Sequence, residues 1–192
     1  MSGTDVRDGI AFATLVRQEM PRLYALARRL VATDAEDLLQ DCLLRAHRSF
    51  PSLRDEVAAQ AWLKSILLNC AKDRYRAASR HPEELVDPVD DFSLFRQIAA
   101  ADPFPYSDAL HVDFLCCFDA EDVWQVLARL PLLYRVPLVL VHMEGRATKE
   151  TAELLEVPLG TLLSRLHRGR KLFERELWEY ATRNDLLSGR PR

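Results

Sequence analysis

Glycine and long apolar runs are scarce in this sequence. Its 192 residues include only 6 glycines, which leaves little material for the tight turns of a sheet built from short strands. Leucine, alanine, arginine and glutamate are abundant instead, and these residues favour helices. No segment approaches the roughly 18 consecutive apolar residues of a membrane span. The sequence therefore predicts an all-α protein that does not insert into a membrane.

Signals for export and for catalysis are missing as well. The N-terminus has no basic-then-apolar signal sequence, so we expect a cytoplasmic protein. The sequence has no Gly-rich phosphate loop, no histidine and cysteine cluster with metal-ligand spacing, and no nucleophile motif. We therefore predict that the chain is not an enzyme and has no catalytic residues, metal, cofactor or small-molecule substrate.

The four cysteines do not form a metal-binding or disulfide pattern. They are Cys42, Cys70, Cys116 and Cys117. In a cytoplasmic protein we expect reduced thiols, some of them buried as small apolar side chains. The adjacent pair Cys116 and Cys117 leaves a redox role open.

Acidic residues are concentrated in one segment. Residues 83–113 contain eight carboxylates and one arginine, a balance of −7, although the whole chain has a net charge of only −3. The rest of the chain is therefore basic by 4. The distribution of charge along the chain indicates binding partners better than the net charge does. A basic remainder is compatible with binding to nucleic acid although the whole chain is slightly acidic.

Residues 1–80 carry three segments of helical periodicity, which predict one compact bundle. These helices end at about Val31, at Pro51 and at about Arg76. The side chains expected to face inward from the second helix are Leu39, Cys42, Leu43, Ala46 and Phe50. Those expected to face inward from the third are Trp62, Ile66, Leu67 and Cys70. Thr33 and Glu36 have the spacing of a capping box, in which Thr33 accepts from the backbone N–H of Glu36.

Periodicity fails between about residues 77 and 118, where several prolines interrupt any long helix. We interpret residues 81–118 as a flexible acidic linker. A second helical domain, residues 119–192, follows, and its segment 136–141 is apolar enough to be its most buried helix. The fold class is therefore all-α, with two small helical domains joined by a long linker.

The second domain contains a helix-turn-helix pattern. A helix over residues 148–155, a three-residue break at Glu156-Val157-Pro158 and a last helix over about 159–180 have the required spacing. One face of the last helix should pack inward through Leu162, Leu166, Gly169 and Phe173. The opposite face carries Ser164, His167, Arg168 and Lys171, with Arg165 and Arg170 beside them. A basic face alone is often only solvated, but after a short helix and a tight turn it predicts binding in the DNA major groove.

Two parts of the sequence resemble the extracytoplasmic-function (ECF) sigma factors, which are RNA polymerase subunits of the sigma-70 superfamily. The likeness to their region 2 lies in residues 34–41 (DAEDLLQD), Arg45-Ala46, Ala61-Trp62-Leu63, Ile66 and Asn69. The likeness to their region 4 lies in residues 130–135 (LPLLYR), Glu144-Gly145 and residues 157–170 (VPLGTLLSRLHRGR). The resemblance implies a transcription initiation factor whose partners are core RNA polymerase, through its β′ clamp coiled coil and β flap, and promoter DNA.

The resemblance also implies roles for individual residues. Those implied to bind the β′ coiled coil are Glu36, Asp37, Leu38, Gln40 and Asp41. Those implied to bind and melt the −10 element are Lys64, Asn69, Lys72, Arg74 and Arg76, whereas Trp62 is expected in the core. Those implied to read the −35 element are Ser164, Arg165, His167, Arg168 and Lys171. The linker is implied to enter the polymerase channels, although an acidic tether is an alternative.

Two residues depart from the pattern of the family. Leu163 stands where the family usually has a polar or basic residue, so one contact is absent or replaced by an apolar contact to a thymine methyl. Thr151 replaces a usual aliphatic residue, which puts the packing of its helix in doubt. Two alternatives remain: a helix-turn-helix regulator, or a sigma mimic that sequesters an anti-sigma protein. An anti-sigma factor is in any case a further partner that the resemblance allows.

Overall fold

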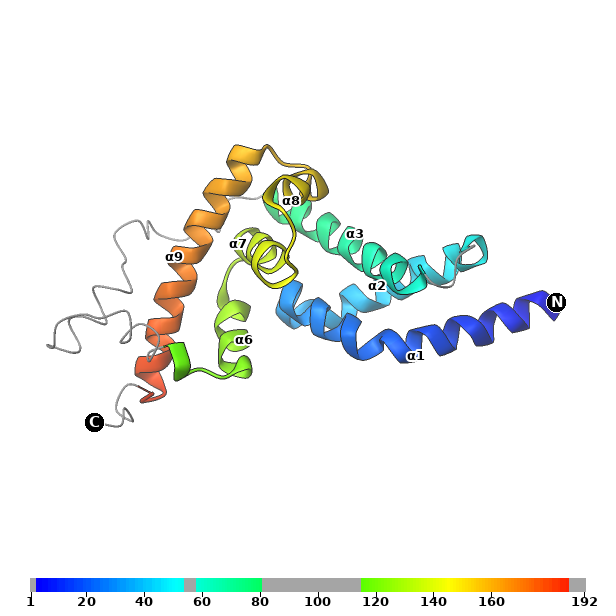
Figure 1. Ribbon diagram of the computed structural model, residues 1–192, viewed down its shortest axis with the longest axis horizontal. Helices are drawn as coiled ribbons and strands as arrows, with labels where there is room; N and C mark the ends of the chain where they lie inside the picture. The colour runs from blue at the N-terminus through cyan, green and yellow to red at the C-terminus, as the bar shows by residue number, and fades with distance from the viewer. Residues whose placement is uncertain (1–2, 54–57, 81–114, 187–192) are drawn as a thin grey trace, which may run out of the picture. The chain divides into compact units, whose positions relative to one another are not determined.

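The described part of the chain is helical. The computed structural model describes residues 3–53, 58–80 and 115–186, and these ranges contain helices and turns but no strand (Figure 1). The predicted all-α class is confirmed. The chain divides into two compact units, Met1–His81 and Pro82–Arg192, which are described separately below. Most of the predicted linker, with its acidic segment, lies outside the described residues.

The first unit is a bundle of three helices, α1 (Gly3–Val31), α2 (Ala35–Ser49) and α3 (Ala59–Ser79). Each helix packs against the other two (Figure 1). The largest side chains that the bundle buries completely are Leu30, Leu38, Leu63, Leu67 and Tyr75. Burial of one such side chain contributes roughly 1.5–3 kcal/mol, so this apolar centre holds the three helices together.

The predicted inner faces are largely confirmed, with differences at their edges. Cys42, Ala46 and Leu67 are buried as expected, whereas Trp62 is only half-buried and packs at a ring distance of 6.2 Å from Phe50. The other expected inward residues divide in the same way: Leu39 and Cys70 are buried, and Leu43, Phe50 and Ile66 are half-buried. The amphipathic pattern therefore predicted correctly which faces point inward, but it overestimated the burial of the residues at the edges of those faces.

The predicted capping box at the start of α2 is wrong. The chain passes through a short 3-10 turn, η1 (Ala32–Asp34), in which Ala32 has a positive φ of 51°. Asp34 then occupies the N-cap position of α2 and makes no side-chain cap bond. The Thr33 hydroxyl instead donates to the Asp34 carboxylate at 3.2 Å. The turn moves the helix start one residue along, so Thr33 is too early to cap it.

The second unit contains α6 (Ala120–Arg129), α7 (Leu132–Leu138), the π-helical turn η4 (Val139–Met143), α8 (Thr148–Leu155) and α9 (Leu159–Arg183). A capping box begins α6: the Asp119 carboxylate accepts from the backbone of Glu121 and Asp122, and Asp122 accepts from the Asp119 backbone at 3.0 Å. Long α9 packs on α6, α7 and α8 (Figure 1). It is the element around which this unit is organised.

The apolar segment predicted over residues 136–141 is buried except for its last residue, Val141, which is half-buried. The buried stretch begins earlier than predicted and runs from Leu133 to Leu140, across α7 and the start of η4. Helix α9 comes close to this segment at Gly169, where a side chain would find almost no space: an added Cβ would lie 3.1 Å from Leu138 Cδ1 and 3.2 Å from Tyr134 Cβ. Glycine at this position therefore allows the two helices to come together.

The predicted helix-turn-helix is confirmed by α8 and α9. Helix α8 ends at Leu155, Glu156 adopts a left-handed conformation with φ 55° and ψ 44°, and α9 begins at Leu159. Thr151 is fully buried, and its hydroxyl donates to the carbonyl of Ala147 at 3.0 Å. Because this hydrogen bond satisfies the buried hydroxyl, the doubt about packing at Thr151 is removed.

Candidate protein and nucleic-acid interfaces

The outer face of α2 presents the acidic and amide groups singled out in the sequence. Glu36, Asp37, Gln40 and Asp41 are exposed. They recur at the spacing of neighbouring helical turns, so they form one continuous polar surface. Leu38 needs a correction, because its side chain is 0% exposed and lies in the bundle core. It supports this surface from below and is not a contact residue.

An apolar residue that the sequence analysis missed lies on the same surface. Leu44 is 58% exposed, the largest exposed fraction among the exposed large apolar side chains of the described residues. It follows Gln40 by four residues and Asp41 by three, which places it beside both on the helix surface. The sequence could have indicated this residue, because Leu44 is a large apolar side chain that does not belong to the predicted inward face of Leu43 and Ala46. An apolar side chain ringed by polar ones is a common centre of protein interfaces.

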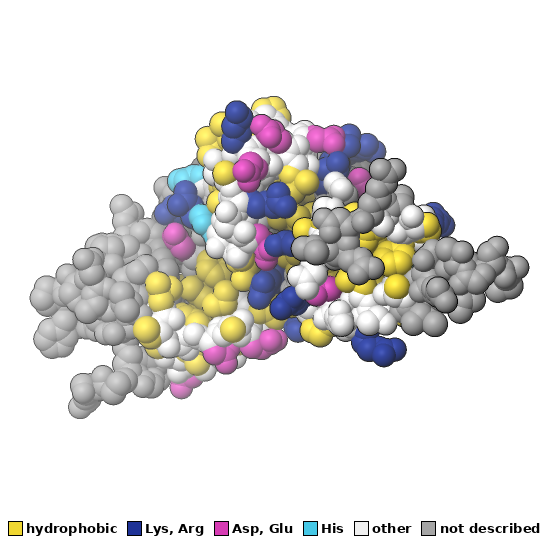
Figure 2. Space-filling view, turned by 45° about the vertical axis from the view of Figure 1, so that its right-hand side comes forward, with side chains coloured by type: hydrophobic (Ala, Val, Ile, Leu, Met, Phe, Trp, Pro, Cys, Tyr) yellow, Lys and Arg dark blue, Asp and Glu magenta, His cyan; other side chains and the backbone are white. Residues whose placement is uncertain are grey.

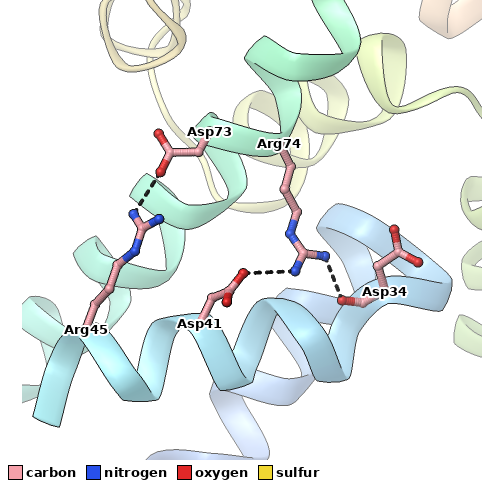
Figure 3. A network of polar contacts seen from close by, with 5 residues as sticks. All are labelled: Asp34, Asp41, Arg45, Asp73 and Arg74. Atoms are coloured by element: carbon pink, nitrogen blue, oxygen red, sulfur yellow. Dashed lines mark hydrogen bonds and ion pairs between the residues drawn. The ribbon is translucent and has the colours of Figure 1, made fainter.

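Two ion pairs join α2 to α3 (Figure 3). Arg45 contacts Asp73 at 2.7 Å, and Arg74 contacts Asp41 at 3.2 Å. Arg74 also donates to the backbone carbonyl of Asp34 at 3.0 Å. In the isolated chain Arg74 is therefore engaged by α2, and its assignment to the −10 element stays a prediction. Its partners are 33 and 40 residues away in sequence, so no local pattern indicated them.

The remaining α3 candidates divide into two groups. Asn69 and Arg76 are exposed and Lys72 is half-buried, and their spacing of three, four and seven residues places them on one face of the helix. Lys64 is half-buried and lies on a different side of α3 by the same spacing rule. The structure thus brings together an amide and two cations, with the exposed Arg80 one turn further along.

The cysteines are reduced thiols, none of them in a disulfide. Cys42 and Cys70 are buried in the first unit, as expected of some of the four, while Cys116 is exposed and Cys117 is half-buried. Burial raises the pKa of the Cys42 thiol to about 12, and its Sγ lies 3.9 Å from the carbonyl oxygen of Leu63. A thiol that stays protonated is a poor nucleophile, so Cys42 serves packing.

The outer face of α9 carries most of the side chains predicted to read DNA. Ser164, His167 and Arg168 are exposed, whereas Arg165 and Lys171 are half-buried. Lys171 also lies 3.7 Å from Glu174 in an ion pair along the helix. The upper edge of Figure 2 shows basic, acidic and apolar side chains close together, and histidine lies on the left flank below it. Of the inward face predicted for α9, Leu162, Leu166 and Gly169 are buried and Phe173 is half-buried.

Two rows of residues run along this outer face. Leu159, Leu163 and His167 follow one another at intervals of four residues, and Gly160, Ser164 and Arg168 form the neighbouring row. Leu159 is 43% exposed and Leu163 is 49% exposed. Arg170, also exposed, continues the face. On this outer face, the first two turns of α9 therefore present apolar or small side chains, and the positively charged side chains begin one turn later.

The far end of α9 is held against α6. The Tyr180 hydroxyl donates to the Asp122 carboxylate at 2.5 Å, and Arg129 lies 5.8 Å from the centre of the Tyr180 ring. This hydrogen bond, with one from the Asp119 backbone, lowers the pKa of Asp122 below its ordinary 3.8. The same bond raises the pKa of Tyr180. These contacts, together with the buried Leu177, fix α9 at the end remote from its exposed face.

A largely apolar cavity of about 330 Å³ opens in the second unit between α6, α7, η4 and α9. Its lining residues are Val123, Leu127, Leu138, His142, Met143, Arg170, Phe173 and Glu174. Among the residues that the structure describes, no group of three or more His, Cys, Asp or Glu side chains is arranged to hold a metal ion. None of the helices in the same ranges is both long enough and apolar enough to cross a membrane.

Comparison with known proteins identifies both units. The sigma-70 region 2 family model matches residues 15–81, and the sigma-70 region 4 model matches residues 120–173. The ECF RNA polymerase sigma factor SigM of Mycobacterium tuberculosis is 35% identical over 175 residues, which cover 88% of this chain and 79% of SigM. The ECF RNA polymerase sigma factor SigW of Bacillus subtilis is 27% identical over 176 residues, covering 88% of this chain and 90% of SigW.

A solved structure of the sigma factor RpoE in complex with the anti-sigma factor NepR, from Bartonella quintana, is more distant. It covers 87% of this chain and 96% of its own, at 22% sequence identity and a TM-score of 0.46. A likeness of that size supports no functional comparison. The family models and the similarity to SigM carry the assignment, and they confirm the family predicted from the sequence. The chain belongs to the ECF sigma factors of the sigma-70 family, transcription initiation factors that direct RNA polymerase to promoters and are not a class of enzymes.

Proposed function

We propose a division of labour between the two units. Residues 1–80 bind core RNA polymerase and the −10 element, residues 119–192 read the −35 element, and residues 81–118 connect them. The observation that carries this proposal is the exposed face of α9, where Ser164, His167 and Arg168 stand on the second helix of a helix-turn-helix. Cations and a hydroxyl in that position fit the phosphates and base edges of the major groove.

The outer face of α2 is the proposed surface for the β′ clamp coiled coil. Asp37, Gln40 and Asp41 supply acidic and amide groups there, and Leu44 supplies an exposed apolar centre. A basic coiled coil would be attracted by the carboxylates, which speed encounter and set orientation. Leu44 would then be desolvated on docking, which contributes affinity.

The face of α3 formed by Asn69, Lys72 and Arg76 is the proposed −10 surface. The amide of Asn69 has donors and an acceptor with which to hold an unstacked base, and the two cations are suited to the adjacent phosphates. Unstacking a base costs a few kcal/mol, so melting requires both kinds of contact. Arg74 is left out of this surface because α2 already engages it.

Further contacts with partners complete the proposal. The apolar cavity between α6, α7 and α9 suits a short apolar segment, and we assign it to the β flap. An anti-sigma factor would compete for these same surfaces. Because the proposed partners are RNA polymerase and promoter DNA, we propose that the protein acts in the cytoplasm.

The −35 assignment is tested by transcription in vitro with core polymerase and full-length protein. Arg168→Ala should lower transcription from templates that depend on a −35 element by about five-fold or more, since a good bidentate contact to a base is worth roughly 1–3 kcal/mol. Arg183→Ala, an exposed arginine at the other end of α9, is the matched control and should leave transcription unchanged. Equal output from Arg168→Ala and the control would remove the assignment.

The polymerase assignment is tested by co-purification. The double variant Asp37→Lys and Asp41→Lys should no longer co-purify with β′, because charge of the wrong sign then faces the coiled coil. The Asp41→Lys change also breaks the ion pair between Asp41 and Arg74. Arg74→Ala breaks that ion pair but leaves the carboxylates of α2 in place, so this control variant should still co-purify with β′. Retention of β′ by the double variant would contradict this docking surface. Tight, sequence-specific DNA binding by the free protein without stimulation of core enzyme would instead favour the regulator alternative.

A further inference from the structure

Two leucines lie exposed at the start of the helix that we assign to DNA. Leu159 and Leu163 are 43% and 49% exposed, on successive turns and in one row of α9. A single exposed leucine needs no explanation, because much of any protein surface is apolar. Two at this spacing, on the face that bears Ser164, His167 and Arg168, call for a partner of their own.

Gly160, which follows Leu159 on α9, indicates that the partner approaches the helix backbone closely. Gly160 is exposed within α9, and a Cβ placed there would meet nothing within 4 Å. Neither packing nor a positive φ therefore requires glycine here. Alanine would make a better helix residue, so its absence is consistent with a ligand that approaches the helix backbone closely. The open space lies directly beside the row of the two leucines.

The positively charged residues near the two leucines indicate what kind of molecule binds there. Going along the helix from Leu163, the next exposed side chains in the two rows are His167 and Arg168, followed by Arg170. No acidic residue lies on α9 before Glu174. An apolar pair at the tip of a helix that becomes basic one to two turns later matches duplex DNA, whose groove floor is uncharged and whose rims carry phosphates.

Within the major groove only thymine carries an apolar group that projects from the base edge, the C5 methyl beside its O4 acceptor. Cytosine has only a hydrogen at that position, and the edges of guanine and adenine present donors and acceptors. A leucine side chain can neither donate nor accept a hydrogen bond, so opposite any other base it would desolvate polar groups without replacing their bonds. We infer that Leu159 and Leu163 recognise thymine in the −35 element by packing on its methyl group.

This inference rests on the proposed −35 function of α9 and makes that function more specific. Arg168 and His167 would hold the helix on the phosphates, and Ser164 would contact a neighbouring base edge or phosphate. The leucines would then set which sequence is preferred. Affinity and sequence preference therefore reside in different residues of the same face and can be separated by experiment.

The test uses holoenzyme assembled from core polymerase and the full-length chain. Selection from templates with a randomised −35 region first gives the preferred sequence of the wild-type protein. Each selected thymine is then replaced by 2′-deoxyuridine, which removes the methyl group alone. We expect at least one replacement to weaken promoter binding about fourfold, the effect of burying one methyl-sized group.

Leu163→Gln and Leu159→Ala supply the protein side of the test. Both residues are exposed, so the variants should fold, which circular dichroism checks. Each variant should abolish the fourfold preference at the thymine on which its own leucine packs, so holoenzyme with Leu163→Gln or with Leu159→Ala should bind the thymine and deoxyuridine templates for that position equally well. Holoenzyme with Arg168→Ala should bind both more weakly while keeping the fourfold difference between them.

Three results are distinguishable from the expected one. If wild-type holoenzyme needs the −35 element but selects no thymine, or binds deoxyuridine templates equally well, the inference is wrong and the proposed function stands. If it ignores the −35 element altogether, the proposed function fails as well. If Leu163→Gln weakens transcription equally from a template without a −35 element, the leucines bind a protein and the inference is again overturned.

Discussion

The packing of α9 on α7 can be tested with two glycines of the same helix. An alanine side chain at Gly169 would place its Cβ 3.1 Å from Leu138 Cδ1 and 3.2 Å from Tyr134 Cβ, both in buried side chains. At Gly160 the same Cβ would meet nothing within 4 Å. Both changes gain up to about 1 kcal/mol of helix propensity. Only Gly169→Ala adds overpacking, which costs about 1–3 kcal/mol.

The expected outcome is a difference between the two variants of about 1–3 kcal/mol in the free energy of unfolding. Gly160→Ala should match or exceed the wild-type stability, and Gly169→Ala should fall below that of Gly160→Ala. The measurement is urea unfolding followed by tryptophan fluorescence. A Trp62→Phe background leaves Trp124 and Trp178 as the reporters, both in the second unit. Equal midpoints and slopes for the two variants would refute the argument that α7 and α9 approach closely at Gly169.

Two further predictions concern titration. The Tyr180 bond lowers the pKa of Asp122 below 3.8, so the stability that Asp122 contributes is present above that value and is lost as the pH falls through the folded-state pKa. Tyr180→Phe should therefore flatten the decline in stability of the second unit below about pH 4, measured by urea unfolding at a series of pH values, and an unchanged decline would contradict the role of this bond. Burial that raises the pKa of Cys42 to about 12 predicts that iodoacetamide at pH 8 leaves this thiol unmodified in folded protein and modifies it in urea, as peptide mass spectrometry would show. Rapid labelling of Cys42 in folded protein would mean that the bundle opens easily.

Features set by local periodicity were predictable from the sequence. The inward face of α9, with Leu162, Leu166 and Gly169, follows from the helical repeat alone, and so does the outward placement of Ser164 and Arg168. The break between α8 and α9 was also predictable, because Pro158 stands three residues after Leu155, the last periodic position of α8.

Features set by distant parts of the chain were not predictable. Arg74 contacts Asp41 across 33 residues, so the sequence pattern of its own helix did not indicate this partner. Leu38 belongs to a family motif, but the motif does not say that its side chain points into the bundle. The capping box at Thr33 failed because the 3-10 turn begins at Ala32 with a positive φ, and alanine is not a residue type that indicates such a conformation.

Helix α9 is one uninterrupted element from Leu159 to Arg183, and its two halves serve different purposes. Leu163 near one end is solvent-exposed, and Tyr180 near the other is packed on α6, roughly 25 Å away along the axis at 1.5 Å per residue. A tilt of about five degrees at the packed end would displace the exposed end by roughly 2 Å, given that length. Under the proposed −35 function, the direction in which α9 points at the promoter depends partly on side chains that do not touch DNA. Substitutions around Tyr180 should then alter promoter choice while leaving the residues proposed to face the groove intact.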